Sequence, residues 1–128
     1  MYKQGQYNLK DKKAMVYRLT YTRDSLGQSL ATYTPIAPSD LWCYTRQLSQ
    51  DMTLRAMAYG AEETRFFVFN YHDEIKAGEY IKYKDNWYEI TRADTTDDYN
   101  GDKVVYAKDK FAPRDSEIQP YTPPNDSN

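Results

Sequence analysis

Residues 80–91 read Tyr-Ile-Lys-Tyr-Lys-Asp-Asn-Trp-Tyr-Glu-Ile-Thr. Hydrophobic and polar side chains alternate in both halves of this stretch, and alternation with a period of two is typical of a β-strand. Asp85-Asn86 lies between the halves and suits a two-residue loop, because both residue types tolerate left-handed backbone. The stretch therefore predicts a β-hairpin, with its turn at Asp85-Asn86, and indicates a mainly β protein.

Strand-like runs continue on both sides of this hairpin. Asp24 to Gly27 predicts a turn, Gly78 suits a positive φ, and Asn100-Gly101 is the strongest hairpin signal in the chain. Seven short strands joined by turns favour a sandwich or barrel. The expected strands cover about residues 15–22, 29–36, 41–45, 65–69, 80–84, 87–91 and 103–107. The side chains expected to face inward are Leu19, Trp42, Phe66, Val68, Ile81, Tyr83 and Ile90.

Composition divides the chain into three parts. Residues 1–13 are polar and predict an N-terminal arm, whereas 14–109 carry the strand pattern and predict the barrel domain. Residues 110–128 are polar and rich in proline, so they predict an extended C-terminal tail. Residues 47–62 interrupt the strand pattern with side chains that favour helix, and they are too few for a stable isolated helix. They form either a short helix that caps the barrel or a mobile excursion.

Charge and hydropathy exclude several function classes. The formal charge is −2, from 17 basic and 19 acidic side chains, so no basic excess favours tight binding to nucleic acid. No apolar run is long enough to span a membrane, and the N-terminus lacks the apolar stretch of a signal peptide. The chain is therefore expected in a reducing cytoplasm when it is made. Its 14 tyrosines suit exposed sheet faces and interfaces.

No catalytic, cofactor-binding or metal-binding residues are predicted. Cys43 is the only cysteine and His72 the only histidine, too few for a zinc site, and we expect Cys43 to be buried. No nucleophile motif and no phosphate-binding glycine motif is present, which leaves a small hydrolase with little support. The acidic loop at 94–102 lacks the spacing of a calcium loop. Tyrosines and lysines alternate over residues 80–84, so an oligonucleotide-binding barrel stays open as an alternative.

The stretch 14–109 resembles the head-closure proteins of long-tailed bacteriophages, also called head–tail joining, head completion or stopper proteins. The resemblance depends on the order of isoleucine, glycine, acidic residue, hydrophobic-x-Tyr, turn, and aromatic-Glu-Ile. The matching runs are Tyr17-Arg-Leu-Thr20, Leu41-Trp-Cys-Tyr44, Arg65-Phe66, Ile75-Lys-Ala-Gly-Glu79, Tyr80-Ile-Lys-Tyr83 and Trp87-Tyr-Glu-Ile90. Asp85-Asn86 stands where the family often has glycine, and the tail beyond Lys110 has no counterpart in the family pattern.

This resemblance implies a β-barrel of about six or seven strands and a structural, non-enzymatic role in the virion neck. It implies a homo-oligomeric ring of about six or twelve copies around the channel through which double-stranded DNA leaves. The ring would lie beneath the portal and adaptor proteins, close the filled head, and meet a tail terminator or tail tube protein. A tail terminator or another tail-interface ring protein stays open as an alternative.

Two sets of residues are candidate contacts in such a ring. The first lies in the 47–62 excursion and forms a candidate gate or inter-ring loop, which would change conformation on assembly: Met52, Leu54, Arg55, Met57 and Tyr59. The second lies in the C-terminal tail, which would bind a neighbouring subunit: Phe111, Pro113, Ile118, Pro120 and Tyr121.

Overall fold

Seven strands and one short 3-10 helix make up the regular structure of the part of the chain that the computed structural model describes, which covers residues 10–49, 54, 63–70, 74–96 and 102–123. The elements are β1 (Lys12–Arg23), β2 (Ser29–Pro35), β3 (Leu41–Gln47), β4 (Arg65–Phe69), β5 (Tyr80–Tyr83), β6 (Asn86–Thr96), β7 (Asp102–Lys110) and η2 (Asp115–Glu117). No described helix is long and apolar enough to cross a membrane.

Six of the strands close into a barrel, as the sequence predicted. The hydrogen-bonded order is β1-β3-β4-β7-β6-β5, and β5 pairs again with β1. The first half of β1 provides this closure, because Lys12–Ala14 pair with β3 and Met15–Tyr17 pair with β5. All of these strand pairs are antiparallel. Each of the six strands therefore pairs on both sides over part of its length, which removes the continuous free edges of an open sheet.

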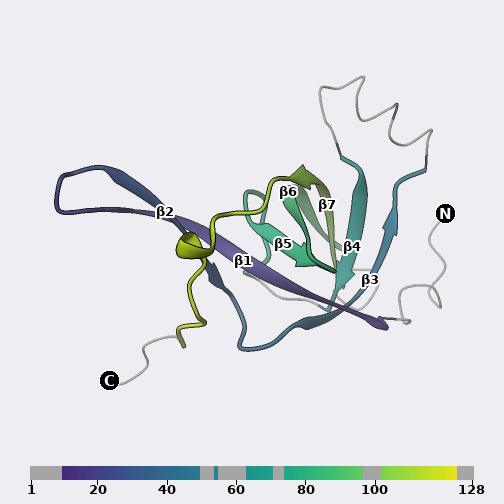
Figure 1. Ribbon diagram of the computed structural model, residues 1–128. Coiled ribbons are helices and arrows are strands. Elements are labelled where there is room, and N and C mark those ends of the chain that lie inside the picture. Colours follow the sequence, from purple (N-terminus) through teal and green to yellow (C-terminus); the bar gives the residue numbers. More distant parts are fainter. Residues whose placement is uncertain (1–9, 50–53, 55–62, 71–73, 97–101, 124–128) are drawn as a thin grey trace.

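The seventh strand, β2, lies outside the barrel wall. It pairs with the second half of β1, from Tyr17↔Pro35 to Arg23↔Ser29, and the two form a hairpin that projects away from the barrel (Figure 1). Beyond Pro35, the Ile36 amide donates to the Val16 carbonyl at 2.9 Å, so the chain continues along β1 toward β3. Proline has no amide hydrogen to donate, which accounts for the break between β2 and β3. We call this hairpin the β1–β2 arm.

The barrel interior is filled by side chains. Phe67 is fully buried, and its ring centroid lies 6.1 Å from Phe69, 5.9 Å from Tyr83 and 5.5 Å from Tyr88. Ile81, Tyr83 and Ile90 belong to the same cluster, as predicted. The other buried members are Ala14, Val16, Ile36, Ala37, Cys43, Phe69, Ile75, Tyr88, Val105 and Ala107. The barrel is therefore packed and is not itself a channel.

Four inward assignments were wrong. Phe66 is only partly buried and packs with Tyr44 and Tyr106 at 6.0 and 6.3 Å, because Phe67 and Phe69 take the interior positions of β4. Trp42 is 52% exposed, since the neighbouring Cys43 faces the interior. Leu19 lies in a second cluster outside the barrel. Val68 is buried, but it lies on the same face of β4 as Phe66 and outside the barrel cluster.

The predicted positive φ at Gly78 and the predicted turn ending at Gly27 are confirmed, whereas the turn of the β5–β6 hairpin lies one residue earlier than predicted. Gly27 and Gly78 have φ values of 82° and 92°, where a side chain would be strained. The β5–β6 turn consists of Lys84 and Asp85, with φ values of 50° and 66°, because Tyr83 pairs directly with Asn86. Two successive left-handed residues are typical of a type I′ turn, so the hairpin was predicted correctly and its turn one residue too late.

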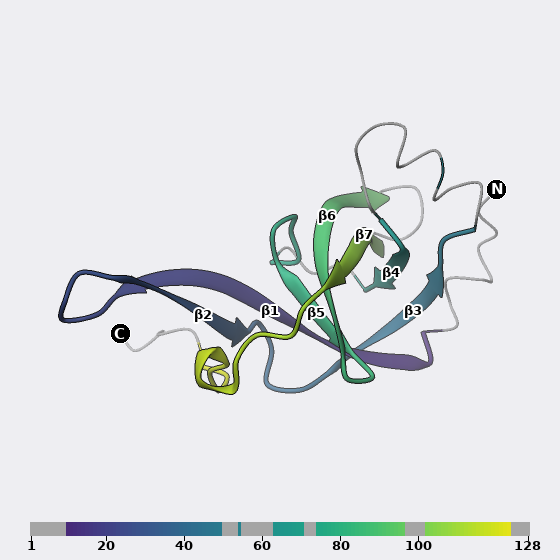
Figure 2. The same ribbon diagram turned by 45° about the horizontal axis from the view of Figure 1, so that its top comes forward.

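A second cluster, outside the barrel, fixes the root of the β1–β2 arm. Tyr17, Tyr80 and Trp87 are buried there, with Tyr33 and Ile118 packed against them. The ring centroids of Tyr17 and Trp87 are 4.8 Å apart, and those of Tyr33 and Tyr80 are 5.1 Å apart. We call this set, with the partly buried Met15 and Leu19, the aromatic cluster. It joins the arm to β5 and β6, so the arm has a fixed direction (Figure 2).

Candidate functional site

The described residues hold few groups suited to metal binding or thiol chemistry. No group of three or more His, Cys, Asp or Glu side chains that could hold a metal ion occurs among them. Burial raises the pKa of the Cys43 thiol to about 12, so the reactive thiolate is scarce near neutral pH. His72 lies outside the described residues.

Of the five candidate gate residues, the structure describes Leu54, and it also describes the two points where the 47–62 excursion leaves and rejoins the barrel. Leu54 is exposed, whereas Met52, Arg55, Met57 and Tyr59 lie outside the described residues. At the base, the Leu48 amide donates to the Thr64 carbonyl at 2.9 Å. This contact brings the two ends of the intervening segment together.

Glu63 anchors the return of this segment to the barrel. Its side chain is buried and accepts a hydrogen bond from Thr91 Oγ1 at 2.5 Å and one from Arg92 Nε at 3.2 Å. The Arg92 guanidinium in turn lies 3.9 Å from the ring centroid of Tyr106, a cation–π contact. A buried carboxylate requires such partners, so the structure fixes the chain at Glu63.

The candidate tail residues are only partly brought together. Ile118 packs against the aromatic cluster of its own chain, forms a parallel bridge with Tyr33, and is followed by Gln119, whose amide donates to the Tyr33 carbonyl at 2.9 Å. Phe111 is 94% exposed, and Pro120 is also exposed. Pro113 and Tyr121 are partly exposed. The tail therefore begins as a strap on the root of the β1–β2 arm.

An exposed apolar surface at the end of the arm was missed in the sequence analysis. Leu26, in the turn, is 82% exposed. Tyr21 and Leu30 are also exposed, but they lie on opposite faces of the hairpin, because Tyr21 pairs with Ala31 whereas Leu30 pairs with Thr22. We call the turn that carries Leu26, from Asp24 to Gly27, the arm tip. A leucine within the polar turn Asp24-Ser25-Leu26-Gly27 was the available signal, because turns normally carry polar residues.

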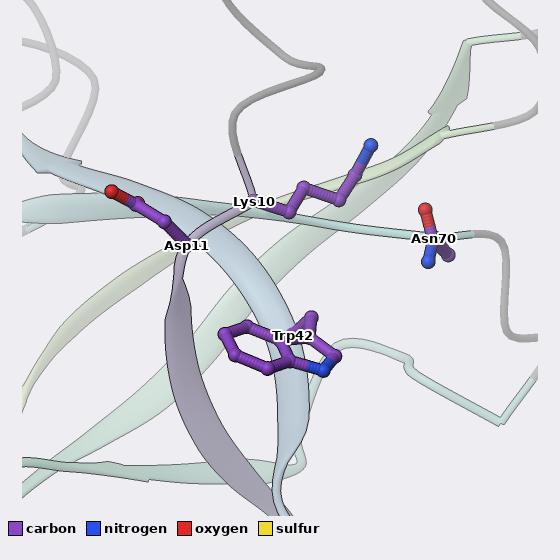
Figure 3. A pocket seen from close by; sticks show the side chains of 4 residues that line it. All are labelled: Lys10, Asp11, Trp42 and Asn70. Carbon is purple, nitrogen blue, oxygen red and sulfur yellow. The ribbon is translucent and has the colours of Figure 1, made fainter.

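A shallow pocket lies at the opposite end of β1. Lys10, Asp11, Trp42 and Asn70 line it, and the Trp42 indole forms an aromatic wall (Figure 3). Lys13 pairs with Trp42 in the sheet, and its ammonium lies 4.5 Å from the Trp42 ring centroid. Lys10 Nζ lies 3.2 Å from Asp102 Oδ1, which links the pocket to the start of β7. We call the pocket lined by Lys10, Asp11, Trp42 and Asn70 the Trp42 pocket.

A carboxylate beside the arm has an altered acidity. Burial raises the pKa of Glu79 above its ordinary value, while the Lys76 amide and the Arg18 guanidinium act in the opposite direction. Arg18 Nε lies 3.5 Å from Glu79 Oε2, and Arg18 Nη2 lies 3.1 Å from Glu74 Oε2. These contacts connect β1 to the loop that precedes β5.

The surface expected of an oligonucleotide-binding barrel is absent from β5. Tyr80 and Tyr83 are both buried, in the aromatic cluster and in the barrel core respectively. Bases stack on exposed aromatic faces, so these rings offer no stacking platform. This burial argues against the oligonucleotide-binding alternative for that strand.

Comparison with known proteins gives one family and one fold. The family model described as phage head completion protein matches residues 10–109. Among solved structures, the solution structure of protein SF1141 from Shigella flexneri 2a is similar with a TM-score of 0.64, at 18% identity over 77% of this chain and 90% of that one. At this identity the likeness shows a shared fold. No match was found among curated proteins.

Proposed function

The chain belongs to the phage head completion protein family, and from this premise we propose that it forms a ring that closes the DNA-filled head and provides the surface to which the tail attaches. Membership itself assigns a structural role in the head-to-tail connector, in the virion neck. The proposed ring contains about six or twelve copies and lies between the portal and adaptor proteins and the tail terminator or tail tube protein.

The observation that carries this proposal is the extent of the family match. Residues 10–109 include all but the last residue of the seven strands, from β1 through β7. The β1–β2 arm lies within the match as well, so it belongs to the part of the chain that resembles the family. The exposed apolar side chains of the arm tip and of Trp42 support a role in protein contacts, because such surfaces are typical of interfaces.

The packed barrel limits where DNA passes. Fully buried side chains such as Phe67 and Val105 fill its interior, so the exit channel would run along the axis of the ring, between subunits. The net charge of −2 suits a wall past which DNA moves, since a strongly basic surface would bind the phosphates. The chain would be synthesised in the host cytoplasm and assembled there onto filled heads.

A phage that lacks this gene tests the proposal. Filled heads of the mutant should lose their DNA and carry no tails, and purified protein added to freshly filled heads should restore both DNA retention and tail joining. A buffer-treated sample serves as the negative control. Mutant heads that keep their DNA without the protein would contradict closure and would favour a tail terminator instead.

A further inference from the structure

We propose that the arm tip of one copy docks into the Trp42 pocket of the next copy, so that each subunit grips its neighbour head to tail around the ring. This inference rests on the proposed function, because it names the contact that would hold the ring together. It uses two exposed apolar side chains of the described residues, Leu26 and Trp42.

The arm tip is rigid before any partner binds. Asp24 Oδ1 accepts hydrogen bonds from the Leu26 and Gln28 amides, both at 2.9 Å, and the Gly27 amide donates to the Asp24 carbonyl at 3.0 Å. Further along the hairpin, the Thr20 and Thr32 hydroxyls are hydrogen-bonded at 2.6 Å. A preorganised loop loses little conformational entropy when it docks, which favours its use as a binding element.

The direction of the arm is fixed as well. At its root, Tyr17 and Tyr33 pack on Trp87, with ring centroids at 4.8 and 6.3 Å. Ile118 and Gln119 cover the outer edge of β2 at Tyr33. The arm is thus held away from its own barrel on both sides (Figures 1 and 2), and its exposed end faces whatever lies next to the molecule.

The Trp42 pocket has the composition of a binding site for an apolar side chain. The 52% exposed indole provides an aromatic surface, and Lys10, Asp11 and Asn70 provide a polar rim. Interface hot spots combine an aromatic anchor with a polar surround that excludes water. The polar turn atoms next to Leu26, those of Asp24 and Ser25, would meet this rim when Leu26 meets the indole.

Geometry excludes an arm that fills its own pocket. Trp42 pairs with Lys13 near the start of β1, while the tip follows Arg23 at the end of β1. Ten residues of extended strand separate these points, a distance of roughly 30 Å. A tip that docks in this pocket must therefore belong to another molecule, and a second copy brings one tip for every pocket.

The contact would generate a ring and not a closed dimer. Tip and pocket are unlike surfaces at opposite ends of one strand, so their union is heterologous and leaves one free tip and one free pocket on each pair. Successive copies add until the rotation per subunit closes the circle. An isologous dimer would instead require one patch to face its own copy.

Two single variants of the full-length chain test this contact. Leu26→Asp puts a charge on the tip and leaves the pocket intact, whereas Trp42→Ser removes the aromatic wall and leaves the tip intact. Leu26 is 82% exposed, so Leu26→Asp should keep the melting behaviour of the wild type. Trp42 is half-buried and contacts Lys13, so Trp42→Ser should melt somewhat lower while it keeps the far-UV circular dichroism of the wild type. Asn86→Asp, which adds a charge at an exposed residue at the start of β6 that belongs to neither surface, is the matched control.

Light scattering of the assembled protein reports the outcome. We expect rings from the wild type and from Asn86→Asp, monomers from each test variant alone, and dimers from their equimolar mixture, because one working tip and one working pocket remain in each mixed pair. Rings from both test variants, or a mixture that stays monomeric while the wild type forms rings, would overturn the arm contact and leave the proposed ring standing.

Cross-linking within virions gives the same test where the ring assembles only on filled heads. Cysteines at Leu26 and Asn70 of one chain are too far apart to pair with each other, and the native Cys43 is buried. Oxidation should produce a ladder of cross-linked chains that reducing agent collapses, and either single cysteine variant should give none. Normal virions without a ladder would refute the arm contact, whereas virions whose necks lack the protein would refute the proposed function itself.

Discussion

Replacing Phe67 by alanine should destabilise the barrel far more than the same replacement of its neighbour Phe66. Phe67 is fully buried, and its ring lies within about 6 Å of three other aromatic rings. Truncation of a buried phenylalanine costs about 3–5 kcal/mol of unfolding free energy, from lost burial and the cavity that remains. Phe66 is partly exposed on the outer face, so its loss should cost about 1–2 kcal/mol.

Urea denaturation, followed by tryptophan fluorescence, measures this difference. Domains of this size are stable by about 5–15 kcal/mol, so Phe67→Ala should remove a third or more of the total in a marginal case. The midpoint should shift while the slope with denaturant is retained, if the change lies in stability alone. An equal or larger loss for Phe66→Ala would contradict the facing of β4 and the barrel core built on it.

Three further results are expected. Burial raises the pKa of Glu79 above 4.5, so the folded protein binds a proton at this carboxyl more tightly than the unfolded protein. The unfolding free energy should therefore fall as the pH rises from about 4.5 through the folded pKa of Glu79. Thermal melts of Glu79→Gln should lack this pH dependence, and an unchanged pH dependence would count against the burial of Glu79. Cys43, with its pKa near 12, should resist a thiol reagent until urea unfolds the protein, and fast labelling of the native chain would be inconsistent with its position. Ile118→Ala should cost about 1–2 kcal/mol in urea melts because it loosens the aromatic cluster, while the exposed Phe111→Ala should be neutral; equal effects would argue against the strap.

The strands could be predicted from the sequence because hydrophobic and polar residues alternate along them. The sequence could not predict which side chains of each strand point into the barrel. Alternation fails as a guide where a run is apolar throughout, as in Phe66 to Phe69, and there the pairing of β4 with β3 and β7 decides which face is inside. The same holds for Trp42 and Cys43, which are both hydrophobic. The turn at Lys84 was missed because lysine seldom adopts a positive φ.

The candidate surfaces were harder to predict than the fold. Tyr17 and Tyr33 are far in the sequence from Tyr80 and Trp87, and the pairing of β1 with β5 that closes the barrel brings them together. The tail residue Ile118 was expected to serve a neighbouring subunit, and no sequence pattern indicated that it would pack on its own chain. The proposed roles of the 47–62 excursion and of the rest of the tail stay predictions.

Electron cryomicroscopy of the neck of the virion that carries this chain is the most direct test of its role. A ring of six-stranded barrels, about six or twelve in number, should encircle the DNA channel between the head and the tail. Each barrel should extend its β1–β2 arm onto the adjacent copy. A neck whose density is fully accounted for by other proteins, with this chain found elsewhere in the particle or absent from it, would contradict a role in head closure.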